Sequence, residues 1–277
     1  MAIEAALPRF ASEAKLVSNL SRLAAQLARR QGGTWVILNE HDVTGRIVDI
    51  SALRLDVRAL RTRVSGEWFR PLSEPELRTL RSLRADRAVQ LATLARQLRL
   101  AQTSAARIVR GLLSDGLVQR TSTGGLVRAV TLKPIVDRVM TFEAKLSDWR
   151  RALFQARAHQ SFADFAYVAF DAAFQRRFEK GLSAYARQGV GLFAIAAQGG
   201  TAAAVLPSRR SASTSALFRA LNAERTLARL LGHRLNELPE SRLPNASAGS
   251  GRRESPQLLG PRAKTVMRLV AGSARLR

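Results

Sequence analysis

The sequence predicts an α/β protein, a mixed sheet flanked by helices, with a mainly helical segment inserted into the sheet. Two observations support this prediction. Short β-branched strand patterns lie on both sides of residues 72–132, and that segment itself has the amphipathic periodicity of short helices. The 277 residues, 46% of them hydrophobic, are enough for one large domain or two ordinary ones. The order of expected elements is therefore helix, strand, strand, insertion, and then strand, helix, strand, helix, strand, strand.

The first helix is expected over 10–31, because its leucines recur at helical spacing. Strands are expected over 34–39 and 45–53, around a turn, and 54–66 is a basic connector that could continue the second strand. The remaining expected elements are helices at 72–83, 88–100 and 103–116, a hairpin at 118–132, a strand at 138–146, a helix at 147–163, a strand at 166–170, a helix at 171–188, strands at 189–198 and 201–208, and a helix at 213–232. Beyond them, 245–257 is a low-complexity linker and the last twenty residues are a basic tail.

The charge is strongly positive and unevenly distributed. There are 45 Lys+Arg against 21 Asp+Glu, a formal net charge of +24. Forty of the basic residues are Arg, a bias that a GC-rich genome also produces, so their positions are more informative than their number. Residues 50–138 and 209–277 each carry net +10, whereas 1–49 carry +1 and 139–208 carry +3. Two strongly basic segments indicate an anionic partner, with nucleic acid as the leading candidate.

Composition excludes several classes of function. The absence of Cys excludes disulfides, thiolate nucleophiles and Cys-ligated zinc, and three His argue against a His-rich metal site. No apolar run reaches the roughly 18 residues of a membrane span, and the N-terminus lacks the basic region of a signal peptide. No glycine-rich phosphate loop or Ser-His-Asp nucleophile motif supports ATP-driven function or acyl transfer. We therefore expect a cytoplasmic, nucleoid-associated protein with DNA as partner, no membrane contact, and homodimerisation left open.

The inserted segment has the apolar pattern of a three-helix core followed by a hairpin. Its small Ala95 suits a helix crossing, and Gly116 suits a left-handed turn after the third helix. On this pattern, residues 72–132 resemble the winged helix-turn-helix of MarR-like and IclR-like bacterial regulators. The resemblance implies that the third helix enters the DNA major groove and the hairpin acts as a wing. The implied DNA-binding residues are Gln102, Thr103, Ser104, Arg107, Arg110, Arg120 and Arg128. The alternative is a winged helix used for protein contacts or as scaffold.

The regions around the insertion carry a second pattern. One expected strand contains Gly45–Asp49, a later strand contains Glu143-Ala144-Lys145, and a helix follows at 149–159. This order resembles the restriction-endonuclease-like PD-(D/E)XK nuclease superfamily. The resemblance implies that Asp49 and Glu143 bind Mg²⁺ or Mn²⁺. The implied catalytic residues are Asp49, Glu143 and Lys145, with Glu13 and Gln155 as additions found in some branches.

Chemistry explains those residue types. Mg²⁺ prefers carboxylate oxygens, and a bound divalent ion polarises phosphate and lowers the pKa of water. Strand alternation puts Glu143 and Lys145 on one face, where the ammonium can act on the attacking water. Two features depart from the family pattern: Val48 stands where Pro is usual, and the insertion separates Asp49 from Glu143 by 94 positions. The structural alternative is an ordinary Glu–Lys pair on a strand with Asp49 as a buried cap.

These patterns are compatible with three hypotheses about the function of the protein. The leading hypothesis is a DNA-binding protein with a metal-dependent phosphodiesterase (DNase) site. The alternative is a winged-helix transcriptional regulator whose flanking α/β domain is non-catalytic, and the third is a DNA-compacting protein. The expected domains are 1–60 and 138–208 for the two parts of the nuclease-like region, 61–137 for the winged helix, and 209–277 for a basic C-terminal helix and tail.

Overall fold

The computed structural model describes residues 8–43, 45–65, 70–212 and 214–231. The expected linker at 245–257 and the basic tail lie outside these residues. The chain divides into two compact units. We call Met1–Asp56 with Val136–Asn222 the sheet unit, and Val57–Ile135 with Ala223–Arg277 the helical unit.

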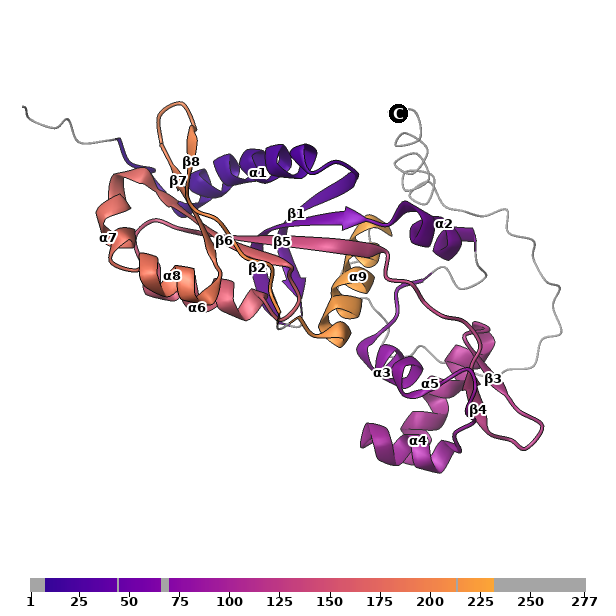
Figure 1. Cartoon of the computed structure of the whole chain (residues 1–277). Helices are drawn as coiled ribbons and strands as arrows, with labels where there is room; N and C mark the ends of the chain where they lie inside the picture. The colour runs from indigo at the N-terminus through magenta and orange to yellow at the C-terminus, as the bar shows by residue number, and fades with distance from the viewer. Residues whose placement is uncertain (1–7, 44, 66–69, 213, 232–277) are drawn as a thin grey trace, which may run out of the picture. The chain divides into compact units, whose positions relative to one another are not determined.

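The sheet unit is built on a mixed sheet that the described residues form from six strands in the order β1-β2-β5-β6-β7-β8 (Figure 1). β1, β2 and β5 run antiparallel, β5, β6 and β7 run parallel, and β8 is antiparallel to β7. The mixed α/β class is thus confirmed. The strands are β1 Thr34–Val43, β2 Arg46–Leu55, β5 Val136–Lys145, β6 Phe165–Asp171, β7 Gly191–Ile195 and β8 Ala202–Leu206.

The pairing of β2 with β5 decides where the candidate site lies. These strands are neighbours in the sheet although the whole insertion separates them in the sequence, and Ile50 lies opposite Phe142 in their register. Asp49 is the residue before Ile50 on β2, and Glu143 is the residue after Phe142 on β5, so both acids are one position away from this pair. The insertion therefore leaves the Asp-bearing strand beside the Glu-x-Lys strand.

Helices cover both faces of the sheet (Figure 1). On one face, α1 (Glu13–Arg30) buries Leu16, Leu20, Ala24 and Ala28 against β2, β5 and their neighbours. The other face packs against α6 (Trp149–His159), α7 (Gln175–Glu179) and α8 (Leu182–Gln188). The helical periodicity of the sequence predicts both helical layers because the buried positions recur every three or four residues.

The continuous helix expected over 171–188 is wrong. The structure has a short 3-10 turn, η1 (Ala172–Phe174), followed by α7 and α8, with Gly181 at the break. A Cβ on Gly181 would lie 2.5 Å from the Trp149 ring. The close approach of α6 therefore requires glycine there, and glycine weakens a helix.

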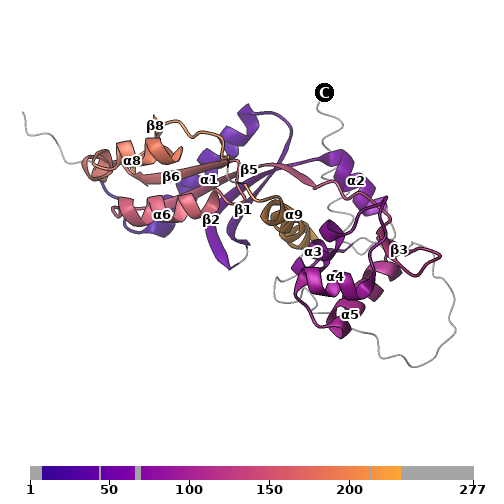
Figure 2. The same cartoon turned by 60° about the horizontal axis from the view of Figure 1, so that its bottom comes forward.

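The helical unit contains the winged helix-turn-helix. Figure 2 shows its helices α3, α4 and α5 with strand β3 of the wing. Arg99 ends α4 in a left-handed conformation, and Gly116 after α5 has a φ of +69°. In the wing, the Thr121 N–H donates to the Gly125 carbonyl at 2.8 Å. The elements are α3 Glu74–Ser82, α4 Leu91–Leu98, α5 Gln102–Ser114, β3 Val118–Arg120 and β4 Leu126–Arg128.

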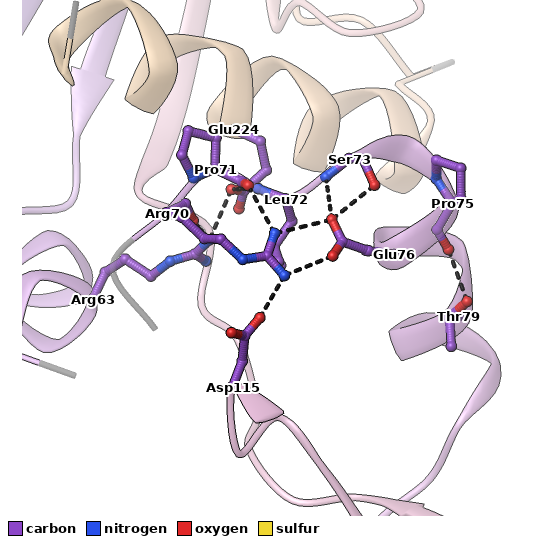
Figure 3. A network of polar contacts seen from close by, with 10 residues as sticks. All are labelled: Arg63, Arg70, Pro71, Leu72, Ser73, Pro75, Glu76, Thr79, Asp115 and Glu224. Carbon is purple, nitrogen blue, oxygen red and sulfur yellow. Dashed lines mark hydrogen bonds and ion pairs between the residues drawn. The ribbon is translucent and has the colours of Figure 1, made fainter. Parts of the chain in front are cut away.

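One further helix of this unit differs from the expectation. The second strand continues past its expected end only as far as Leu55, and from Val57 to Ser65 the expected connector is the helix α2 instead. The buried Arg63 in α2 bonds Glu224 of α9 (Ala216–Leu231) at 2.8 Å, and Glu224 also accepts from the Leu72 N–H at 2.7 Å (Figure 3). Hydrophobic periodicity did not indicate α2, because a sequence pattern treats arginine as solvent-exposed whereas Arg63 is buried.

A second group of charges fixes the start of α3. The Glu76 carboxylate accepts from the Ser73 N–H at 2.8 Å and from Arg70 at 2.6 Å. Arg70 also pairs with Asp115, directly after α5 (Figure 3). Ser73 and Pro75 thus begin this helix as the sequence predicts, and Arg70 connects that start to the end of α5.

Candidate DNA interface and carboxylate centre

The outer face of α5 presents the residues expected to contact DNA. Ala105, Val109 and Leu112 are buried on its inner face. On the opposite side, Gln102, Thr103, Arg107 and Arg110 are exposed, and Ser104 is half-buried. Because helical positions three and four apart share a face, burial of one stripe leaves the other available to a partner.

The two arginines of this face are available for phosphate or base contacts. Neither Arg107 nor Arg110 forms an ion pair within the described part of the chain. On the wing, Arg120 is exposed and Arg128 is half-buried. Exposed guanidinium groups at a helix and an adjacent hairpin match the contacts that winged helices make with a groove and its flanking phosphates.

A second cluster of charges lies where β2, β5 and the start of α1 meet. The Lys145 ammonium is 3.2 Å from a Glu143 oxygen and 3.3 Å from a Glu13 oxygen. It also donates to the Ala144 carbonyl at 2.9 Å. The Asp49 carboxylate accepts from the Ala144 N–H at 2.7 Å. The structure therefore brings together Asp49, Glu143, Lys145 and Glu13, which we call the carboxylate centre.

Glu143 is the most perturbed member of the carboxylate centre. Its side chain is buried, and one carboxylate oxygen, Oε2, has no hydrogen-bond partner among the described residues. Burial and the neighbouring Asp49 carboxylate raise the pKa of Glu143 to about 7. A buried acceptor without a donor is costly unless something else compensates it.

Asp49 and Lys145 respond to the same environment. Burial raises the pKa of Asp49 above its usual value, and the nearby Lys145 opposes this shift. Burial lowers the pKa of Lys145, but the carboxylates of Glu143, Asp49 and Glu13 outweigh that effect and raise it. The lysine is thus held charged among carboxylates that repel one another.

The residues present fit a divalent cation in one respect. The unpartnered Glu143 oxygen and the raised pKa values of both acids describe a centre that a positive ion would stabilise. The Ala144 carbonyl, a further ligand candidate, already accepts from Lys145. Among the described residues, no three His, Cys, Asp or Glu side chains are grouped as a metal site. Any protein-derived ligand set here is therefore small, and water would complete it.

Gln155 lies on α6, which packs against β5 and β6. Its Oε1 atom is buried and finds no hydrogen-bond partner in the described ranges of the chain. Within the part of the chain that the structure describes, no hydrogen bond joins Gln155 to the carboxylate centre, so its role there stays a prediction.

Sequence reasoning missed the outer face of α6. Phe154 there is 75% exposed, between Arg150 and Arg157. A helical wheel carries the signal, because it places Phe154 opposite the buried Ala152 and Ala156.

Comparison with known families supports one of the two resemblances. Residues 72–123 match the model of the MarR family. No curated protein and no solved structure matches the chain significantly. The inserted segment is thus a winged helix-turn-helix similar to that of the MarR family. Nothing comparable supports the nuclease resemblance of the surrounding region.

None of the described helices is long and apolar enough to cross a bilayer.

Proposed function

We propose that this protein binds duplex DNA through residues 72–132 and acts as a winged-helix transcriptional regulator. The observation that carries this proposal is the exposed polar face of α5, within a segment that matches the MarR family. The net +10 of residues 50–138 supports it, since neutralising phosphates releases counterions and drives binding. Gln102, Thr103 and Ser104 would meet base edges, and the arginines would meet phosphates.

The test is duplex binding by the full chain over a range of salt concentrations. Arg107→Glu with Arg110→Glu should weaken binding and reduce the slope of log K against log salt by about 2. The matched control is Arg29→Glu with Arg30→Glu, an equal charge change at the exposed end of α1. Equal losses in both double variants would show that total charge, and not the recognition helix, drives binding.

A second candidate function is metal-dependent hydrolysis of DNA at the carboxylate centre. The specific observation that favours it is the buried, unpartnered Glu143 oxygen beside Asp49 and Lys145. Asp49 and Glu143 would hold Mg²⁺ or Mn²⁺, which when bound would polarise a phosphate and acidify water.

Lys145 and the groups around it would assist this hydrolysis. Its ammonium would stabilise charge that develops on phosphate, and Glu13 and the Ala144 carbonyl would hold it in place. Gln155 would orient a water or phosphate with its amide. If the centre holds no metal, the same contacts simply stabilise the sheet, and the α/β unit is non-catalytic.

A plasmid-nicking assay with Mg²⁺ or Mn²⁺, with and without EDTA, separates these functions. Asp49→Asn, Glu143→Gln and Lys145→Ala should each abolish cleavage while leaving duplex affinity unchanged or slightly higher, since losing an acid reduces repulsion of phosphate. Glu179→Gln removes an acid from α7 and serves as control. A wild-type protein that binds DNA and cuts under neither ion would eliminate hydrolysis and leave the regulator.

A further inference from the structure

The outward face of α6 carries an exposed aromatic ring in the sheet unit. Ala152 and Ala156 are fully buried against the sheet, and Phe154 points away from them with 75% of its surface exposed. A phenylalanine in that position contributes nothing to the core on which α6 packs. Single exposed apolar side chains are common, so the ring becomes informative only through its neighbours.

Those neighbours are cationic. Arg150, Arg151 and Arg157 are exposed, and they lie three or four positions from Phe154 on the same side of the helix. None of the three forms an ion pair with any residue that the structure describes, and α6 contains no Asp or Glu. The Arg150 guanidinium lies 5.0 Å from the centre of the Trp149 ring, which anchors it beside the start of the helix.

The start of β2 extends this surface past the end of α6. Arg46 donates to the Ala158 carbonyl at 2.8 Å, and Ala158 lies one helical turn beyond Phe154. The next residue, Ile47, is 64% exposed. Phe154 and Ile47 are the large apolar side chains that the described residues leave exposed, and Phe154 is the one that lies among arginines of α6. We call Arg46, Arg150, Arg151, Phe154 and Arg157 the α6 surface.

We infer that the α6 surface binds a single-stranded stretch of DNA, with phosphates on the arginines and a base stacked on Phe154. Arginines around an exposed aromatic ring are the combination that single-strand binding sites use, because every unpaired base presents a π-face. A duplex would engage the arginines but would leave the ring without a stacking partner. A second copy of the chain would bring like charges together at this surface.

This inference rests on the proposed DNA binding but concerns a different unit of the chain. The winged helix lies in the helical unit and is assigned to duplex DNA, whereas the α6 surface lies in the sheet unit. The two sites should therefore respond to different variants and to different forms of DNA. That separation makes the two proposals distinguishable.

The experiment measures fluorescence anisotropy of a labelled oligothymidine and a labelled duplex with the full chain. Phe154→Ala should weaken oligothymidine binding by about 5- to 150-fold, the range for loss of one stacked base. Phe154→Trp should retain binding, and Phe154→Leu should lose most of it because leucine has no π-face. Arg150→Ala with Arg157→Ala should lower the single-strand salt slope by about 1.4. The control is Arg187→Ala, which removes an exposed arginine of α8. It should change neither the oligothymidine affinity nor the salt slope.

Each result decides for or against the inference. Unchanged oligothymidine binding in Phe154→Ala, or wild-type binding in Phe154→Leu, would overturn it. If Arg107→Glu with Arg110→Glu abolishes binding of both DNA forms, the winged helix carries all binding and the α6 surface carries none. Loss of duplex binding alone in that variant supports two sites. A fall in sedimentation mass in Phe154→Ala, with DNA binding intact, would instead make the surface a contact between copies.

Discussion

Replacing Glu143 with Gln tests whether the negative charge of Glu143 destabilises the folded protein. Glutamine has nearly the shape of the protonated acid and carries no charge. Glu143 is 1% exposed, and burial with the neighbouring Asp49 raises its pKa from 4.5 to about 7. Glu143→Gln should therefore resemble the wild type in acid and be more stable than it above neutral pH.

The direction follows from proton binding. Between pH 4.5 and 7, the folded protein keeps a proton on Glu143 that the unfolded chain has released. The fold is thus favoured in acid, and its stability falls as pH rises through that window. The shift corresponds to about 3 kcal/mol over the whole range, and to about 2–3 kcal/mol between pH 5 and pH 8.

The measurement is urea unfolding of the wild type and Glu143→Gln at pH 5 and pH 8. The difference between the two proteins should grow by about 2–3 kcal/mol at the higher pH. Comparing the two proteins cancels groups that titrate in both, including His159. A difference that stays the same at both pH values would refute the reasoning. Mg²⁺ should stabilise the wild type at pH 8 more than the variant, if the centre holds a cation.

Three other predictions concern stability. Burial lowers the pKa of His159 from 6.5 to about 4, so stability should fall by about 2–3 kcal/mol as pH drops from 6.5 to 4, and His159→Gln should flatten that slope in urea unfolding. Gly181→Ala should lower stability by about 1–3 kcal/mol in the same assay, because the new Cβ overlaps Trp149; an unaffected variant would contradict that contact. Glu224→Ala should lower the free energy of unfolding by about 3–5 kcal/mol, because it leaves Arg63 buried without its partner. Adding Arg63→Met should recover most of that loss. If the two losses were additive instead, the ion pair would not be what stabilises this contact.

Several elements were predictable because their signals are local. The leucines of α1 recur at helical spacing, and the Ser73 start of α3 is set by residues within one turn. Gly116 marks the end of α5 because its left-handed φ suits glycine. The winged helix is therefore recognisable from neighbouring residues alone. The strand β5 was likewise expected, with small differences at its ends.

Contacts between distant segments were not predictable in this way. The helix α2 has a buried Arg63 whose partner, Glu224, stands 161 positions away, and no pattern near α2 reveals that partner. The break at Gly181 depends in the same way on Trp149 of another helix. Local periodicity reports which residues share a face, and says nothing of what packs against it.

In the carboxylate centre, too, one part was predictable from the local sequence and the other was not. Strand alternation is a local property, so the shared face of Glu143 and Lys145 could be read from three consecutive residues. The position of Asp49 beside them depends on the pairing of β2 with β5 across the insertion. The pKa of Glu143 and the exposure of Phe154 depend on which groups surround them in space. Burial and charge interactions act through distance, and only the folded chain sets those distances.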